Sequence, residues 1–113
     1  MTGGGYSPYP RTMSIERTYI VYLLASMKGG TLYCGITSDI VRRMWEHQTG
    51  AVRGFTSKYK VHRLVWFEVH TDVLEAIARE KRIKKWPRQW KIDLIEKDNP
   101  GWNDLLPRLL SGK

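Results

Sequence analysis

The stretch TYIVYLLASMKGGTLYCG, residues 18–35, decides how this chain folds. Its first part, residues 19–25, is almost continuously apolar, as in a strand that is covered on both faces. The segment MKGG, residues 27–30, supplies a turn, because glycine reaches positive φ without steric cost. Residues 31–37 are rich in β-branched and aromatic side chains and predict a second strand. The sequence therefore predicts an antiparallel hairpin.

The length of the turn decides which residues pair across this hairpin. A turn of two or four residues places Tyr22 opposite Gly35 and Tyr33 opposite Leu24. Because side chains alternate along a strand, the two tyrosines then share one face as diagonal neighbours. Gly35 would leave space beside Tyr22 for a molecule other than the protein itself. A three-residue turn would separate the phenols, and two ordinary strand tyrosines are the alternative interpretation.

Length and charge restrict the class of protein. The chain has 113 residues, 42% of them hydrophobic, which is enough for one small domain with a modest core. Lys and Arg number 19 against 11 Asp and Glu, a net charge of +8 that is typical of nucleic-acid binders. Basicity also suits an anionic membrane or an acidic protein. The single Cys34 excludes an internal disulfide and a zinc site built on several cysteines.

The domain organisation follows from shifts in composition. Residues 1–18 combine Gly, Pro, Tyr and Ser without a hydrophobic period and are expected to form a flexible leader. The domain itself is expected over residues 19–97, and residues 98–113 as a turn and a short helix packed on it. No apolar run approaches the roughly 20 residues of a membrane helix, and no secretory pattern opens the chain. A cytoplasmic protein with no membrane partner is therefore expected.

The hairpin leads into a basic helix, SDIVRRMWEH, residues 38–47. Ser38 is a suitable N-cap. Arg43 and His47 are four residues apart and share a face, whereas Arg42 projects elsewhere and can pair with Glu46. The predicted apolar stripe of this helix consists of Ile40, Val41, Met44 and Trp45.

A loop with the sequence TGAVRGFTSKYK, residues 49–60, follows this helix. Arg53 and Lys58 alternate there with aromatic residues, a pattern that suits phosphate contacts combined with base stacking. A solvated loop held by one buried aromatic ring is the alternative.

A third strand is expected over residues 61–70 and a long helix over residues 72–86, capped by Thr71 or Asp72. The residues expected to face the core from this helix are Val73, Leu74, Ile77, Ala78 and Ile83. A further helix begins at Pro87 and is expected to pack through Trp90, Leu94 and Ile95. Five tryptophans in a domain of this size more often fill a core than form binding platforms.

The long helix carries the segment AREKRIKKW, residues 78–86. Glu80 is its only acid, among Arg79, Lys81, Arg82, Lys84 and Lys85. One interpretation is a solvated basic face on which Glu80 pairs with Lys84, a contact that contributes about 0.3–0.5 kcal/mol. The other is a metal-binding carboxylate among residues that contact phosphates.

Several of these motifs, in this order, resemble the GIY-YIG endonuclease family. Ile20-Val21-Tyr22 and Tyr33-Cys34-Gly35 are similar to its paired motif, with Ile20 in place of a glycine and Cys34 in place of an isoleucine. GITSDIVRRMWEH resembles its first helix, and AREKRIKKW resembles the helix that holds its metal-binding glutamate. The resemblance covers residues 19–90. The remaining tail looks like a small single-domain bacterial subfamily, which is similar to the nuclease domain of nucleotide-excision repair.

The resemblance implies a set of site residues. The implied catalytic residues are Tyr22, Tyr33, Arg43, His47 and Glu80, with Glu80 as the ligand of Mg²⁺ or Mn²⁺. The residues expected to contact nucleic acid are Arg42, Arg53, Lys58, Lys81, Lys84 and Lys85. In the mechanism that the resemblance implies, Arg43 grips the scissile phosphate. Tyr22, assisted by Tyr33 or His47, positions or deprotonates the attacking water.

The resulting prediction is an α/β (α+β) domain, a small three-stranded sheet flanked by helices. Its expected function is divalent-metal-dependent endonuclease activity on nucleic acid, with structured or damaged DNA favoured and weak sequence specificity. A targeting protein is a compatible partner, and a monomer or weak dimer is expected. The first alternative is a non-catalytic nucleic-acid-binding module with the same fold. The second is a protein-interaction domain that docks an acidic partner.

Overall fold

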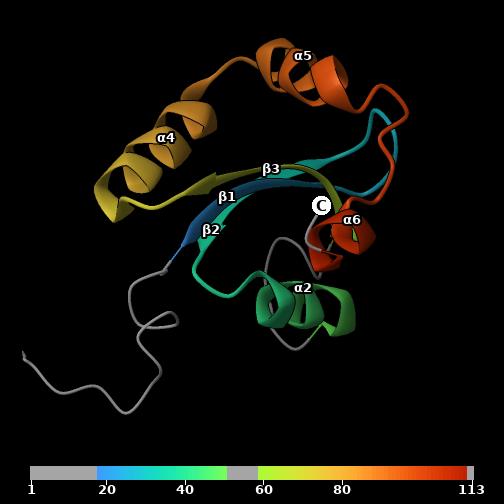
Figure 1. The fold of residues 1–113 in the computed structure, drawn as a ribbon. Helices are drawn as coiled ribbons and strands as arrows, with labels where there is room; N and C mark the ends of the chain where they lie inside the picture. The colour runs from blue at the N-terminus through green and yellow to red at the C-terminus, as the bar shows by residue number, and fades with distance from the viewer. Residues whose placement is uncertain (1–17, 51–58, 112–113) are drawn as a thin grey trace, which may run out of the picture.

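The computed structural model describes residues 18–50 and 59–111 (Figure 1). A three-stranded antiparallel sheet lies at the centre, formed by β1 (Tyr19–Ala25), β2 (Leu32–Thr37) and β3 (Arg63–His70). The strand order is β2-β1-β3, so β1 pairs on both edges. The most apolar segment of the chain is thus the central strand, and it is buried from Ile20 to its end. The predicted α+β class is confirmed.

Helices cover both faces of this sheet (Figure 1). They are α2 (Ile40–Thr49), α4 (Val73–Lys85), α5 (Arg88–Asp98) and α6 (Leu106–Leu110). Figure 1 shows α4 and α5 on one side and α2 and α6 on the other. Among the helices of the described segments, none is long and apolar enough to span a bilayer.

The hairpin has the register that a four-residue turn predicts. Tyr22 pairs with Gly35, and Leu24 pairs with Tyr33. The backbone N–H of Ser26 donates to the Thr31 carbonyl over 3.0 Å. Residues 27–30 form the turn, and Gly29 occupies the left-handed region with φ 71°. The predicted placement of both tyrosines on one face is therefore confirmed.

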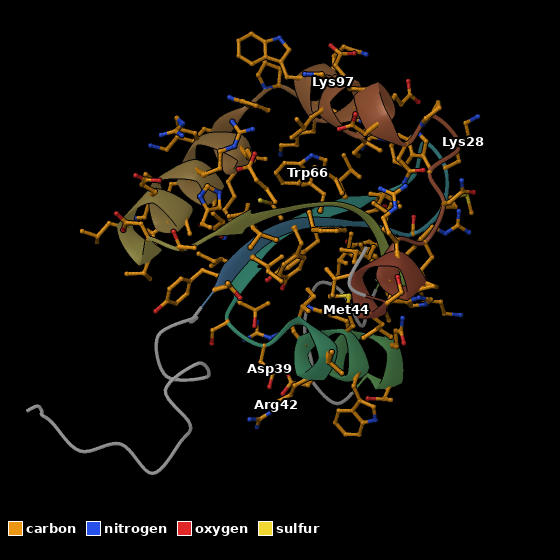
Figure 2. The ribbon with its side chains drawn as sticks, in the orientation of Figure 1. Lys28, Asp39, Arg42, Met44, Trp66 and Lys97 are labelled. Atoms are coloured by element: carbon orange, nitrogen blue, oxygen red, sulfur yellow. The ribbon has the colours of Figure 1, made fainter. Side chains whose placement is uncertain are left out.

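Alternating residues of β1 contribute to two separate hydrophobic clusters. Val21 and Leu23 belong to a cluster on the α4 side, together with Trp66 of β3 (Figure 2). Tyr22 and Leu24 belong to the cluster on the α2 side, which also includes Met44, Ile40 and Val61. Because the sheet is buried on both faces, its central strand has no room for polar alternation.

The C-terminal segment lies on the α2 side. The backbone N–H of Leu105 donates to the Leu64 carbonyl over 2.7 Å. Leu105 is buried, and Leu106 and Leu109 pack against the same cluster as Tyr22. Three leucines of the C-terminal segment therefore complete the hydrophobic cluster on the α2 side.

Several predicted details are wrong, and each error concerns a boundary or a helix face. Asp39 rather than Ser38 caps α2, because its carboxylate accepts the N–H of Arg42 at 3.1 Å. The third strand begins at Arg63 instead of residue 61. Residues predicted to be buried but exposed in the structure are Val41, Trp45, Val73, Leu74, Ala78 and Trp90. The helices are therefore rotated relative to the stripes that hydrophobicity alone indicates.

Candidate active site

The ring of Tyr22 occupies the space above Gly35. A methyl group at position 35 would overlap the hydroxyl oxygen and Cζ of Tyr22 and would crowd the Tyr33 ring. Tyr22 itself has no exposed surface. The predicted open space beside Tyr22 is therefore wrong, because the tyrosine ring fills the volume that the missing side chain leaves.

Three rings meet on the α2 side of the sheet. The Tyr22 hydroxyl lies 3.3 Å from Nε2 of His47, a hydrogen bond between buried groups. The Tyr33 ring centroid is 6.4 Å from that of Tyr22 and 5.5 Å from that of His47. Strand β1, strand β2 and helix α2 each supply one ring, so a cluster of two phenols and one imidazole is held by three elements.

Arg43 borders this cluster and reaches solvent. Its side chain is 39% exposed, and its Nε lies 3.3 Å from a Glu46 carboxylate oxygen. The predicted pair of Arg42 with Glu46 is also present, at 3.4 Å. Figure 2 shows Asp39 and Arg42 at the N-terminal end of α2, where both arginines line a hollow of about 330 Å³ with Thr37 and Ser38.

Burial keeps the Tyr22–His47 pair neutral. Burial is the largest cause that raises the pKa of Tyr22 well above its usual range, and neighbouring Tyr33 raises it further. The charge of Arg43 and its hydrogen bond to the phenol lower that pKa by less. Burial and then the positive Arg43 lower the pKa of His47. At neutral pH the imidazole is therefore a proton acceptor, and Tyr22 is a phenol rather than a phenolate.

Glu80 lies on the other side of the sheet. It belongs to the inward face of α4 with Ala76 and Ile83, and only 8% of it is exposed. Its backbone carbonyl accepts from Sγ of Cys34 at 3.9 Å, and Cys34 belongs to the α4-side cluster. The carboxylate is 2.6 Å from Nζ of Lys84. The predicted i,i+4 pair of Glu80 with Lys84 is therefore present, and its acidic member is buried.

The two sides approach each other around the free edge of β2. That strand is at the border of the sheet, with Tyr33 facing α2 and Cys34 facing α4. The hydrogen bond to Glu80 is the main cause that raises the pKa of Lys84, and the Tyr33 phenol and the Cys34 thiol add to it. Tyr33 is the member of the ring cluster that this edge strand supplies.

The described residues fit only a sparse metal site. Within residues 18–50 and 59–111, no group of three His, Cys, Asp or Glu side chains could hold an ion. Glu80 alone can supply one carboxylate, and Mg²⁺ commonly takes its remaining ligands from water and substrate phosphates. The Lys84 ammonium forms an ion pair with the Glu80 carboxylate, so an incoming metal cation would compete with Lys84 for this ligand.

The remaining predicted contact residues are dispersed. Arg53 and Lys58 lie outside the described residues. Lys81 and Lys85 are exposed on α4, and Arg42 is exposed on α2, on the opposite side of the sheet. Glu46 contacts Arg43 as well as Arg42, and only the contact with Arg42 was predicted. The i,i+3 spacing of Arg43 and Glu46 was the available signal.

Comparison with known proteins defines the class to which this fold and this cluster belong. Residues 18–93 match the model of the GIY-YIG catalytic domain. That range contains all three strands, both tyrosines, Arg43, His47 and Glu80. The chain therefore belongs to the GIY-YIG family, which is a family of nucleases.

The relatives are small proteins that match this chain over most of their own length. A UPF0213 protein of Cupriavidus pinatubonensis is 34% identical over 85 residues, which cover 75% of this chain and 93% of the relative. A UPF0213 protein of Staphylococcus saprophyticus is 33% identical over 81 residues, 72% of this chain and 96% of the relative. These names specify no activity, substrate or metal.

A solved structure supports the same fold. The solution NMR structure of a UPF0213 protein from Bacillus halodurans is 27% identical to this chain and has a TM-score of 0.50. The match covers 79% of this chain and 94% of that protein.

Proposed function

We propose that this protein is a divalent-metal-dependent endonuclease that hydrolyses phosphodiester bonds, with DNA as its main substrate. The observation that carries the proposal is the cluster in which Tyr22, His47 and Arg43 meet. Its hydrogen-bonded phenol and imidazole are 3.3 Å apart, and the Arg43 guanidinium beside them reaches solvent. A neutral proton acceptor next to a fixed positive charge is the arrangement that phosphodiester hydrolysis requires.

Arg43 is assigned to the scissile phosphate. Its planar guanidinium can donate two parallel hydrogen bonds to phosphate oxygens, and its charge opposes the negative charge that grows in the transition state. Glu46 holds the guanidinium at 3.3 Å in the structure. An arriving phosphate would compete with that carboxylate for the same donors.

Tyr33 and His47 are assigned to the attacking water. Tyr33 is the partly exposed ring of the cluster, whereas Tyr22 has no exposed surface. Tyr33 therefore contacts the water, and the proton of the water reaches the neutral His47 through the Tyr22 hydroxyl, which passes its own proton to Nε2 and takes up the one that is released. Tyr22 orients the imidazole through its hydroxyl. The phenolate of Tyr22 is excluded as the base in this conformation, because burial raises its pKa.

Glu80 is assigned as the metal ligand. GIY-YIG nucleases generally use divalent metals. A Mg²⁺ or Mn²⁺ ion at this carboxylate would supply charge stabilisation for the phosphate and its leaving oxygen. The cationic α4 residues around it would contact the flanking backbone of the nucleic acid.

Weak sequence specificity, a cytoplasmic location and a role in DNA repair are further parts of the proposal. The small domain offers little surface for reading base edges. Its net charge of +8 favours backbone contacts that do not depend on sequence.

A nucleic-acid-binding module without turnover is the second candidate, and two observations favour it. Tyr22 is completely buried, and Lys84 already neutralises Glu80 at 2.6 Å. Both features describe a site that must rearrange before it can cleave.

Cleavage assays separate the two candidates. Labelled branched and nicked DNA is incubated with the protein and Mn²⁺ or Mg²⁺, next to a Glu80→Ala variant purified in the same way. We expect cleavage by the natural sequence, loss of cleavage on addition of EDTA, and a reduction of at least about 100-fold in Glu80→Ala. Binding without cleavage would favour the module, and equal cleavage by both proteins would indicate a contaminating nuclease.

A further inference from the structure

Two tryptophans form an apolar groove on the outer surface of α5. Trp86, the C-cap of α4, meets Trp90 edge to face, with ring centroids 5.8 Å apart. Leu94, Asp93 and Lys97 complete a groove of about 310 Å³. Trp90, Leu94 and Lys97 are spaced i, i+4 and i+7, so they share one face of the helix. Figure 2 shows Lys97 on α5, on the side of the molecule opposite α2.

Trp86 and Leu94 of this groove also pack against the α4-side core, whereas Trp90 does not belong to it. The tryptophans that fill the α4-side core are Trp66 and Trp102, which are 7% and 1% exposed. Trp90 is 55% exposed, although the sequence predicts it as a core contact of α5. The residue of α5 that faces the core is instead Ile95, which is completely buried. An exposed indole beside a second indole is a typical binding surface rather than a packing element.

One cation and one acid line the groove, and further cations border it at the end of α4. Lys97 lies inside it, and Arg82 and Lys85 are exposed in the last turn of α4, directly before Trp86. The Arg79 guanidinium, which forms an ion pair with Glu68 at 3.0 Å, lies over the Trp86 ring, 5.4 Å from its centroid. Among residues 18–50 and 59–111, the acid that lines the groove is Asp93, which accepts a hydrogen bond from Gln89 at 2.9 Å. Aromatic rings bordered by cations favour binding of a nucleobase, which stacks on the rings while its backbone phosphate contacts the cations.

The groove lies at the C-terminal end of the helix that carries the proposed metal ligand. Trp86, the C-cap, is six residues beyond Glu80, which corresponds to a rise of about 9 Å along the axis of α4 with the two side chains about 120° apart around it. A strand with a phosphate at Glu80 would therefore bring neighbouring nucleotides over the end of α4.

We propose that Trp86, Trp90 and Lys97 form a stacking site for an unpaired nucleobase of the substrate strand. The site rests on the proposed function, because it assumes a nucleic-acid ligand. It assigns a substrate class that the active-site residues do not define, namely nucleic acid with a single-stranded segment next to the cleaved bond. Trp90 supplies the accessible indole, Trp86 supports it, and Lys97 contacts the adjoining phosphate.

The test uses binding in EDTA, so that it does not depend on catalysis. The probes are a fluorescein-labelled oligothymidylate and a strand of equal length in which abasic sites replace the bases. Trp90→Ala is compared with Trp45→Ala, a matched control because Trp45 is 59% exposed on α2. Circular dichroism checks that both variants keep their fold.

Stacking predicts a loss that depends on the base. We expect Trp90→Ala to bind oligothymidylate roughly 5- to 100-fold more weakly, with Trp45→Ala unchanged. Trp90→Phe should retain most of the affinity. The abasic strand should bind the natural sequence and Trp90→Ala equally, because only the phosphate contacts remain.

Other outcomes overturn the site in distinguishable ways. Equal oligothymidylate affinity in Trp90→Ala and the natural sequence would refute the stacking site and leave the proposed nuclease intact. An equal loss on the abasic strand would show that Trp90 acts through the fold or the phosphates. If the natural sequence binds neither strand, even at low salt, the nucleic-acid ligand is rejected altogether.

Discussion

At the scale of single residues, the position of the Tyr22 ring requires a glycine at position 35. The hairpin register places them opposite one another, and the phenol ring lies across the strand where a side chain at position 35 would project. The sequence predicts the pairing, because turn length and alternation determine register. It cannot predict that the tyrosine fills the space itself, since this depends on how His47 and α2 pack over the sheet.

Gly35→Ala should destabilise the fold by about 1–3 kcal/mol, because the added methyl group overlaps the Tyr22 hydroxyl. Urea denaturation measures this free energy of unfolding. Gly101→Ala is the matched control, since its nearest contact is a flexible Asn103 side chain at 3.2 Å. A stability of Gly35→Ala equal to that of the control would show that the phenol is not fixed above position 35.

His47 gives the fold a defined pH dependence. Its folded-state pKa is lowered by burial and by Arg43, so the unfolded chain takes up the proton first as pH falls. The contribution is complete above about pH 6.5, the usual histidine value, and is lost as pH falls from there through the lowered value. We expect the free energy of unfolding to decrease with falling pH in that window by at most about 1.4 kcal/mol per pH unit.

His47→Gln should flatten this acid limb, measured by urea denaturation across the same pH range. His62→Gln, which removes an exposed imidazole, is the comparison. An equal change in both variants would mean that the buried imidazole does not carry the dependence.

At the scale of elements, α4 shows where a hydrophobic pattern fails. Its apolar residues Val73 and Leu74 are exposed, whereas Glu80 faces inward between Ala76 and Ile83. Hydrophobicity assigns a carboxylate to the outer face, whereas Glu80 is buried and pairs with the half-exposed Lys84. The resemblance to a nuclease family singled out Glu80, which periodicity alone would have placed in solvent.

Lys84→Met should strengthen Mn²⁺ binding, because the ammonium 2.6 Å from the Glu80 carboxylate competes with an incoming cation. A partly exposed pair of this kind is worth up to about 1 kcal/mol, so a roughly 2- to 5-fold lower dissociation constant is expected. Isothermal titration calorimetry without nucleic acid gives the constant directly.

Lys85→Met is the matched control for this measurement, since it removes an equal charge from the next position of α4. Unchanged or weaker Mn²⁺ binding in Lys84→Met than in Lys85→Met would argue that the ion does not bind at Glu80.

At the scale of the whole molecule, the sheet separates the proposed catalytic groups. Tyr22, Tyr33, Arg43 and His47 lie on the α2 side, and Glu80 lies on the α4 side. The sequence predicted three strands, their pairing in the hairpin and the helices around them, because glycine turns, caps and apolar runs are local signals. Which face each helix covers is decided by long-range packing, and no local signal contains it.

In the proposed enzyme these groups form one site around the free edge of β2. The most direct measurement is paramagnetic broadening by Mn²⁺ in NMR spectra of the ¹⁵N-labelled protein, recorded with a phosphorothioate DNA that resists cleavage. The account predicts that the amide of Glu80, the amide of Tyr33 and the side-chain Nε–H of Arg43 broaden together, and that Glu80→Gln abolishes all three effects. Broadening confined to α4, with Tyr33 and Arg43 unaffected, would contradict a single active site.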